Sequence, residues 1–205
     1  MKDGICYIVG AGDNYGLDFI PTENDYIIAA DGGITYLQKA NISVDLIIGD
    51  FDSLVDMPKH PNVIKLNCEK DETDTYEAVR EGIKRGYTIF HIYCCTGGRF
   101  EHTMANTQLL AYIAQHQMRG YLFGKDNIIT AITDDTMYFD SYHKGYISVF
   151  SHSDKSIGVF LKGLKYRLDD ATVINTFPIG VSNEFIGGKS SITVESGTLI
   201  IIFPR

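Results

Sequence analysis

The first 124 residues alternate short apolar runs with helix-like segments. The apolar runs are Ile5–Val9, Tyr26–Ala30, Leu46–Ile48, Val63–Leu66, Thr88–Cys94 and Tyr121–Phe123. Between them, three segments have the composition and spacing of helices: Ile34–Ala40, Asp74–Gly86 and His102–His116. This alternation is typical of βα units, so it predicts a mainly parallel sheet with helices packed against it.

After Gly124 the pattern changes to short β-rich stretches separated by Gly, Ser, Asp and Asn. The clearest stretches are Tyr146–Phe150, Gly158–Leu161, Ser191–Val194 and Thr198–Phe203. No helical period of useful length appears there, which predicts a small all-β, sandwich-like domain. Glu195-Ser196-Gly197 is expected to form the hairpin turn before the last strand. The predicted fold class is therefore α/β for residues 1–124, followed by a β-rich domain at residues 125–205.

Composition and charge narrow the class of protein. The chain has 205 residues, of which 44% are hydrophobic and 21% charged, which are ordinary globular values. A net charge of -8 disfavours nucleic acid as a partner, because such binding needs a basic surface. No apolar run approaches the roughly 20 residues of a membrane helix, and the start does not resemble a signal peptide. The four cysteines (Cys6, Cys68, Cys94 and Cys95) form no metal-binding pair, and we expect a reducing, cytoplasmic location.

Polar clusters follow four of the predicted strands in the first half. They are Asp31-Gly32-Gly33, Gly49-Asp50-Phe51-Asp52-Ser53, Lys70-Asp71-Glu72-Thr73-Asp74 and Gly97-Gly98-Arg99-Phe100-Glu101-His102. The carboxyl ends of parallel strands share one edge of the sheet, and ligands of open α/β folds bind at that edge. The four clusters are therefore expected to converge on one site.

The acidic residues in these clusters suit a divalent cation. Asp50 and Asp52 lie two apart, so continued strand geometry would point both carboxylates to one side, where Mg²⁺ relieves their repulsion. The alternative is that they are ordinary turn residues. Asp74 resembles a helix cap because Glu77 follows three residues later. Thr73 beside it either bonds a phosphate or caps the helix.

Gly97-Gly98 precedes a predicted helix whose free backbone N–H groups would accept an anion. Arg99 adds a planar fork of donors for phosphate oxygens, and His102 and Asn106 lie one helical turn apart. A plain strand-to-helix turn, with His102 as a cap or packing residue, is the alternative. The earlier glycines of Gly10-Ala11-Gly12 with Gly16 miss the dinucleotide spacing by one residue, and we interpret them as a loop weakly able to touch nucleotide.

These motifs together resemble the thiamine pyrophosphokinase family over essentially the whole chain. The resemblance rests on the four clusters, on Asn106, and on Gly180-Val181-Ser182-Asn183-Glu184-Phe185. It implies transfer of pyrophosphate from ATP to thiamine with release of AMP, an Mg²⁺ cofactor, and a homodimer with sites between subunits. It also implies that residues 1–124 bind ATP and Mg²⁺ and that residues 125–205 bind thiamine and dimerise.

The resemblance assigns roles to individual residues. The metal ligands would be Asp50, Asp52 and Asp74, and the catalytic residues Asp31, Asp52, Asp74, Arg99 and His102. The ATP-binding residues would be Asp31, Gly32, Gly33, Thr73, Gly97, Gly98, Arg99 and Asn106. Ser182 and Asn183 would hold thiamine, although a β-turn is an equally good explanation of that pair.

Two departures from the family pattern affect the acceptor more than the donor. Glu101 stands where the family usually has Asp, and the chain has no Trp, which some relatives stack on thiamine. Two other functions therefore stay open. One is a pyrophosphokinase for another small alcohol, such as a hydroxymethyl pterin, and the other is a sensor that binds nucleotide or thiamine without turnover.

Overall fold

A computed structural model describes residues 2–51, 60–67 and 71–205. Its contacts divide the chain into two compact units, one of Met1–Asn106 with Leu122–Gly124 and one of Thr107–Tyr121 with Lys125–Arg205. Helix α3 (Phe100–Gln115) and strand β6 (Arg119–Phe123) are each divided between the units. The functional division at residue 124 that the sequence predicts remains a prediction.

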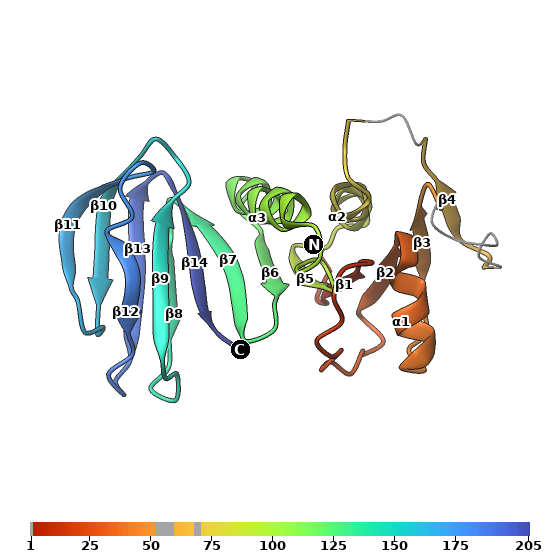
Figure 1. Ribbon diagram of the computed structural model, residues 1–205, viewed down its shortest axis with the longest axis horizontal. Helices are drawn as coiled ribbons and strands as arrows, with labels where there is room; N and C mark the ends of the chain where they lie inside the picture. The colour runs from red at the N-terminus through yellow and green to blue at the C-terminus, as the bar shows by residue number, and fades with distance from the viewer. Residues whose placement is uncertain (1, 52–59, 68–70) are drawn as a thin grey trace. The chain divides into compact units, whose positions relative to one another are not determined.

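The first unit holds a parallel sheet, as the alternation of strands and helices predicts (Figure 1). Its strands lie in the order β5-β1-β2-β3-β4, with every printed pairing parallel. The bounds are β1 Cys6–Val9, β2 Tyr26–Ala30, β3 Leu46–Gly49, β4 Val63–Lys65 and β5 Ile89–Tyr93. Each lies within one or two residues of an expected apolar run.

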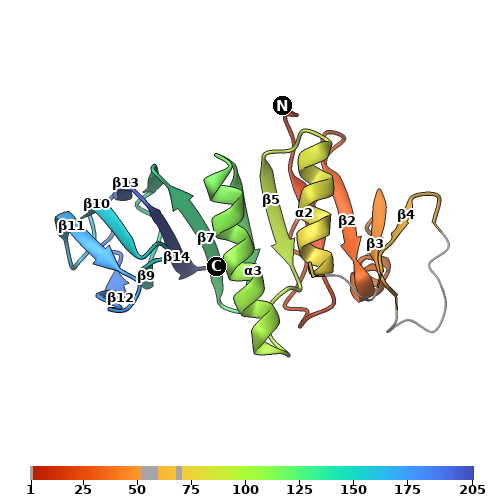
Figure 2. The same cartoon turned by 90° about the horizontal axis from the view of Figure 1, so that it is seen from above.

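Helices cover both faces of this sheet, which explains why the central strands are apolar at every position. Helix α2 (Asp74–Lys84) packs on the face of Cys6, because a Cβ at Gly82 would meet the Cys6 sulfur at 2.8 Å. Helix α1 (Ile34–Lys39) packs with Tyr7 and Val9, which alternate to the opposite face. Figure 2 shows α2 lying along the strands.

The second unit is a β-sandwich, which confirms the predicted fold class. One antiparallel sheet has the order β12-β9-β14-β7 and the other β11-β10-β13-β8. A shared apolar core that includes Ile132, Leu161, Ile192 and Ile201 lies among their strands. The bounds are β7 Asn127–Thr133, β8 Thr136–Phe139, β9 Tyr146–Ser151, β10 Lys155–Lys162, β11 Leu168–Ile174, β12 Gly180–Glu184, β13 Ser190–Ser196 and β14 Thr198–Pro204.

The predicted hairpin at Glu195-Ser196-Gly197 is wrong. Strand β13 pairs with β10 and β8, whereas β14 pairs with β7 and β9, so the turn joins the two sheets instead of two neighbouring strands. Gly197 makes this crossing possible with φ +118°, a conformation that L side chains rarely adopt. Its N–H donates to Asp134 Oδ1 at 2.8 Å, and the Asp134 N–H donates back to the Gly197 carbonyl at 3.1 Å.

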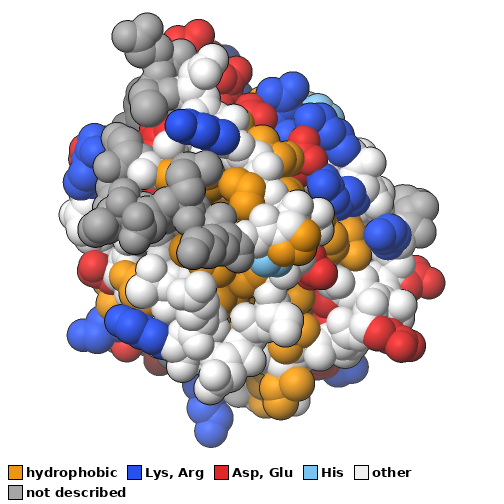
Figure 3. Space-filling view, turned by 90° about the vertical axis from the view of Figure 1, so that its right-hand side faces the viewer, with side chains coloured by type: hydrophobic (Ala, Val, Ile, Leu, Met, Phe, Trp, Pro, Cys, Tyr) orange, Lys and Arg blue, Asp and Glu red, His pale blue; other side chains and the backbone are white. Residues whose placement is uncertain are grey.

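Two sequence-based expectations about the environment can be compared with the described residues. No helix among them is long and apolar enough to cross a membrane. Cys6, Cys94 and Cys95 are buried free thiols, while Cys68 lies outside the described residues. Acidic and basic side chains are interspersed over the face drawn in Figure 3.

Candidate active site

Three carboxylates from different parts of the chain meet at one edge of the parallel sheet. Asp31 follows β2 directly in a short 3-10 helix, Asp50 follows β3, and Asp74 is the first residue of α2. One oxygen of each lies within 4.8 Å of the others, and all three side chains are partly buried. The structure therefore brings together three of the four acidic residues that the sequence proposes for the site. Asp52, the fourth, lies outside the described residues.

The backbone around this cluster bends sharply. Asp31 has φ +50° and Phe51 has φ +61°, both in the left-handed region. Strand β3 ends at Gly49, so the strand geometry that the two-residue spacing assumed does not continue through Asp50 and Phe51. Phe51 instead turns a buried side chain into the core. A Cβ at Gly49 would lie 3.0 Å from the Asp31 Cα, so glycine there lets the two loops approach closely.

Helix α2 is capped by Thr73, not by Asp74. The Thr73 hydroxyl accepts a hydrogen bond from the Tyr76 backbone N–H at 3.2 Å, and Glu77 pairs with Arg80 at 2.8 Å. The capping box expected for Asp74 and Glu77 is therefore wrong by one residue. Because Thr73 makes the capping bond, the Asp74 carboxylate can lie in the acidic cluster.

The chemistry of this cluster fits a small divalent cation. Three carboxylate oxygens so close together repel one another, and oxygen ligands in partly open sites are what Mg²⁺ prefers. Mg²⁺ also keeps several of its coordination positions for water and phosphate oxygens. Asp31, Asp50 and Asp74 are thus a suitable donor set for a metal that also binds a polyphosphate.

The segment between β5 and α3 forms a glycine turn at the same edge. Gly97 has φ +78° and Gly98 has φ +54°, and α3 begins at Phe100. A Cβ at Gly97 would lie 2.2 Å from Asp13 Oδ2, whereas no described residue lies within 4 Å of one at Gly98. Gly97 is therefore required by both its backbone conformation and its neighbour, and Gly98 by conformation alone.

The charged residues after this turn are exposed. Arg99 Nε donates to Glu101 Oε1 at 2.7 Å, and that hydrogen bond lowers the pKa of the Glu101 carboxyl. His102 is exposed as well. Asn106 is buried, and its Nδ2 donates to the Cys95 carbonyl at 2.8 Å, which ties α3 to the end of β5. Contacts of these residues with ATP remain predictions.

The glycines after Asp31 differ in their surroundings. Gly33 is buried, and a Cβ there would lie 1.9 Å from the Val9 carbonyl oxygen, so its place is explained by packing. Among residues that the structure describes, a Cβ at Gly32 would contact only the Ala11 side chain, at 3.2 Å. Of the two, Gly32 has more room for a ligand.

In the second unit, Ser182 and Asn183 lie in β12 and do not form the β-turn that was their alternative explanation. The pairing of β12 with β9 shifts register between Gly180 and Asn183, and Ser182 has φ +57° at this bulge. Asn183 is buried, and its Nδ2 donates to the Tyr166 carbonyl at 2.6 Å while its Oδ1 accepts from the Tyr166 N–H at 2.9 Å.

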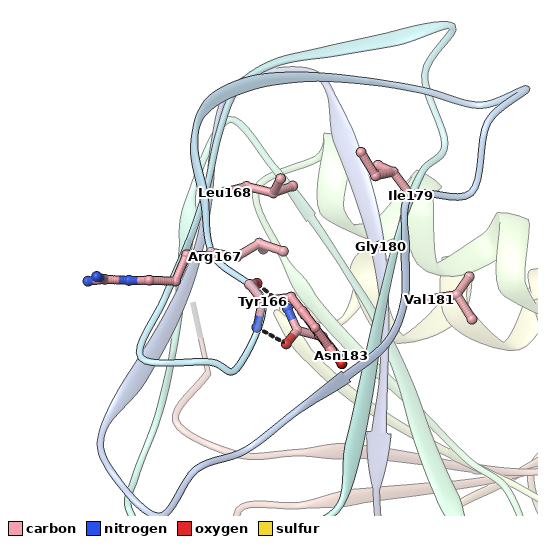
Figure 4. A pocket seen from close by; sticks show the side chains of 8 residues that line it. Tyr166, Arg167, Leu168, Ile179, Gly180, Val181 and Asn183 are labelled. Atoms are coloured by element: carbon pink, nitrogen blue, oxygen red, sulfur yellow. Dashed lines mark hydrogen bonds between the residues drawn. The ribbon is translucent and has the colours of Figure 1, made fainter.

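A pocket of about 240 Å³ lies beside this bulge (Figure 4). Residues 166–168 face residues 179–181 and Asn183 across it, and the Asn183 amide joins the two segments. Ser182 is exposed, and its N–H donates to the Ser148 hydroxyl at 3.1 Å. The Ser182 side chain is thus available to a ligand, whereas Asn183 mainly holds the pocket wall.

Comparison with known proteins gives the family of this chain. The family model described as "Thiamin pyrophosphokinase, catalytic domain" matches residues 20–122, and "Thiamin pyrophosphokinase, vitamin B1 binding domain" matches residues 135–201. The chain belongs to the thiamin pyrophosphokinase family. It is therefore an enzyme of pyrophosphate transfer.

Individual members of the thiamin pyrophosphokinase family resemble this chain over nearly its full length. Thiamine pyrophosphokinase from Bacillus subtilis (strain 168) is 28% identical over 187 residues, which cover 88% of this chain and 87% of the relative. The crystal structure of thiamine pyrophosphokinase from Bacillus subtilis superposes with a TM-score of 0.85 at 26% identity, covering 99% of each chain. A thiamin pyrophosphokinase family protein from Enterococcus faecalis gives 0.83 at 26% identity over 98% of each chain.

Sequence reasoning missed the residues of the loop after β1 that contact the glycine turn. Tyr15 donates its hydroxyl to Asp13 Oδ2 at 2.9 Å, and a Cβ at Gly97 would lie 2.7 Å from that hydroxyl. The Gly12 N–H donates to the Cys94 carbonyl at 2.7 Å, and the Asp13 N–H to the Thr96 carbonyl at 3.1 Å. The closely spaced glycines of this loop were the available signal, because glycine permits such close backbone approach.

Proposed function

We propose that this chain transfers the pyrophosphoryl group of ATP to the hydroxyl of thiamine, giving thiamine diphosphate and AMP. The observation that carries the proposal is the cluster of Asp31, Asp50 and Asp74, which lies at the ligand-binding edge of a thiamin pyrophosphokinase-family fold. The related proteins are named for thiamine, and the second family model is described as binding vitamin B1.

The reaction forms one P–O bond and breaks another. The thiamine hydroxyl oxygen attacks the β-phosphorus of ATP, and the bond from that phosphorus to the oxygen bridging the α- and β-phosphates breaks. AMP leaves with the bridging oxygen, and a carboxylate of the site takes the hydroxyl proton; Asp52 and Asp74 are the two candidates. Such reactions depend on positioning and on stabilising charge, with little covalent chemistry from the protein.

The acidic cluster would hold Mg²⁺ through Asp31, Asp50 and Asp74, with Asp52 as the further ligand that we propose. When bound, the ion would neutralise charge on the transferred phosphate oxygens. Without a cation the three carboxylates would repel a polyphosphate, so the metal and the nucleotide should bind together.

The glycine turn would hold the phosphates with backbone N–H groups at the start of α3. Arg99 would contribute a bidentate contact, for which it exchanges its exposed partner Glu101 for a phosphate. Glu101, which is longer than the Asp that the family usually has here, accepts a hydrogen bond from the Arg99 guanidinium. Gly32, Thr73, His102 and Asn106 remain the other proposed nucleotide-site residues, with Gly33 as support.

For the acceptor, Ser182 would bond thiamine and Asn183 would keep the pocket wall in place. A homodimer is part of the proposal, because the second unit exposes large apolar side chains that a partner subunit would cover. These include Phe177, Ile179, Val181 and Ile186. The free thiols are consistent with a reducing cytoplasm as the location.

A panel of acceptors tests the reaction. The purified protein is incubated with ATP, Mg²⁺ and either thiamine, a hydroxymethyl pterin or another small alcohol, and products are read by mass spectrometry. We expect thiamine diphosphate and AMP. ADP as the main nucleotide product would contradict pyrophosphoryl transfer, a preferred pterin diphosphate would change the acceptor, and thiamine binding without AMP would indicate a sensor.

A further inference from the structure

One buried side-chain oxygen at the proposed nucleotide site has no hydrogen-bond partner among the described residues. It is the hydroxyl of Thr96, which directly precedes the glycine turn and is 7% exposed. Buried hydroxyls are nearly always hydrogen-bonded, because a missing partner destabilises the folded state. The unpaired Thr96 hydroxyl at this site therefore needs a physical explanation.

The backbone carbonyls beside Thr96 are engaged in hydrogen bonds. Three successive carbonyls accept hydrogen bonds: that of Cys94 from Gly12, that of Cys95 from Asn106 and that of Thr96 from Asp13. These bonds come from both sides of the segment, from the loop after β1 and from α3. These three carbonyls therefore have partners, whereas the Thr96 hydroxyl has none among the described residues.

Thr96 is also connected to the acidic cluster. Its neighbour Cys95 has its sulfur 3.7 Å from the hydroxyl of Thr75, and Thr75 follows Asp74 in α2. Both of these side chains are buried. The orphan hydroxyl thus lies on a segment held firmly between the carboxylates and the glycine turn.

We propose that Thr96 is a further nucleotide-binding residue, whose hydroxyl donates a hydrogen bond to a phosphate oxygen. The inference rests on the proposed function, because it takes the glycine turn to be a phosphate site. Gly97 and Gly98 follow Thr96 and have no side chains, and no described residue lies within 4 Å of a Cβ at Gly98, so a phosphate can approach this segment closely. The phosphate oxygen would then be the hydrogen-bond partner that the Thr96 hydroxyl lacks among the described residues.

Calorimetry of binding tests this without any acceptor. Wild-type protein, Thr96→Val and Thr96→Ser are titrated with inorganic tripolyphosphate and with ATP, each with Mg²⁺, and their melting temperatures are measured. We expect Thr96→Val to bind both ligands about tenfold more weakly, which corresponds to about 1.4 kcal/mol. Its melting temperature should be unchanged or higher, because an unsatisfied hydroxyl has been removed. Thr96→Ser should bind nearly as wild type does.

Ser190 provides the matched control, because its hydroxyl is also buried and without a partner among the described residues. Ser190→Ala should keep or raise the melting temperature and leave tripolyphosphate affinity unchanged. Wild-type affinity in Thr96→Val would overturn the proposal. So would a marked loss of melting temperature in that variant, or weakening confined to ATP, since phosphate would not then be the partner.

The result can be separated from that of the proposed reaction. A wild-type protein that binds tripolyphosphate but forms no AMP from ATP and thiamine would contradict the pyrophosphokinase and leave the Thr96 test intact. A wild-type protein that forms AMP but shows no effect at Thr96 would contradict only the inference about Thr96.

Discussion

At the scale of single residues, the acidic cluster combines an electrostatic cost with a chemical role. Oxygens of Asp31, Asp50 and Asp74 within 4.8 Å of one another repel unless a cation lies among them. Replacing one of them should therefore have opposite effects on stability and on activity.

We expect Asp50→Asn to reduce turnover at least about a hundredfold, because losing a metal ligand removes several kcal/mol of transition-state stabilisation. Without metal, its free energy of unfolding should be equal to or above that of wild type, since a like charge is gone. Urea unfolding in chelator and an AMP assay measure the two effects. Asp126→Asn, at an exposed residue, is the control and should change neither. Near-normal turnover of Asp50→Asn would contradict the metal assignment.

His91 on β5 should make the fold less stable in acid. Burial lowers its pKa from 6.5 to about 4, although Asp25 and Asp18 act in the opposite direction. Below about pH 6.5 the unfolded chain therefore binds a proton that the folded chain does not, so stability falls as the pH drops towards 4. The loss amounts to at most about 3 kcal/mol.

Urea unfolding at several values between about pH 4 and pH 7 measures this loss. His91→Gln should show a smaller decline over the same range, because glutamine does not titrate. An equal decline in the variant would assign the pH dependence to other groups. Partial burial raises the pKa of Asp25, but hydrogen bonds from Ile5 and Thr22 outweigh it, so the pKa is lowered overall. Protonation of Asp25 therefore reduces the stability of the fold at a lower pH than protonation of His91 does.

At the scale of elements, the glycine turn between β5 and α3 contains two adjacent glycines, Gly97 and Gly98. Both have a left-handed backbone conformation, but their surroundings differ. Gly97→Ala should lower the free energy of unfolding by more than about 2 kcal/mol, because the new Cβ would be strained and would meet Asp13 Oδ2 at 2.2 Å. Gly98→Ala should lower the free energy of unfolding by only about 1 kcal/mol, since its new Cβ would have no neighbour among the described parts of the chain. Equal losses in urea unfolding would contradict a specific contact with Asp13.

Strand β12 places two adjacent residues in different roles. Asn183→Ala should destabilise the protein by about 2–4 kcal/mol, because the Tyr166 N–H and carbonyl lose their buried partners. Ser182→Ala should leave stability within about 0.5 kcal/mol of wild type and weaken thiamine binding by about 0.5–1.5 kcal/mol. Thermal unfolding and thiamine kinetics separate the two. Unchanged thiamine kinetics in Ser182→Ala would remove that residue from the acceptor site.

The central strands β1, β2 and β3 of the first unit were predictable because each is a continuous apolar run, as strands buried on both faces must be. The convergence of Asp31, Asp50 and Asp74 followed from the shared edge of parallel strands. Strands such as β11, with most residues exposed, lack that signal and were missed. The crossing at Gly197 was mistaken for a hairpin because local turn residues do not reveal which sheet receives the next strand.

Contacts between loops could not be predicted from the sequence, because local residues do not reveal which distant segment they contact. Nothing local indicates that Asp13 meets Gly97, or that the Thr96 hydroxyl has no partner, because both depend on segments far apart in the chain. The capping error at Asp74 was different, since Thr73 and Asp74 are both good caps and only geometry chooses between them.

At the scale of the whole molecule, we expect a homodimer in which the second unit takes part. It exposes four large apolar side chains, which a partner subunit would cover: Phe177, Ile179, Val181 and Ile186. Sedimentation at about micromolar concentration should give about twice the chain mass of 22.9 kDa. Val181→Lys should shift the protein towards monomer, and a fully active wild-type monomer would contradict a site shared between subunits.

The strand order β5-β1-β2 has a consequence for synthesis on the ribosome. Strand β1 leaves the ribosome first and can pair with β2 soon afterwards, but its other edge waits until Ile89–Tyr93 has emerged. During that interval a fully apolar strand presents unpaired backbone groups to other nascent chains. Translation speed between β2 and β5 should therefore govern how much of this protein aggregates before it folds.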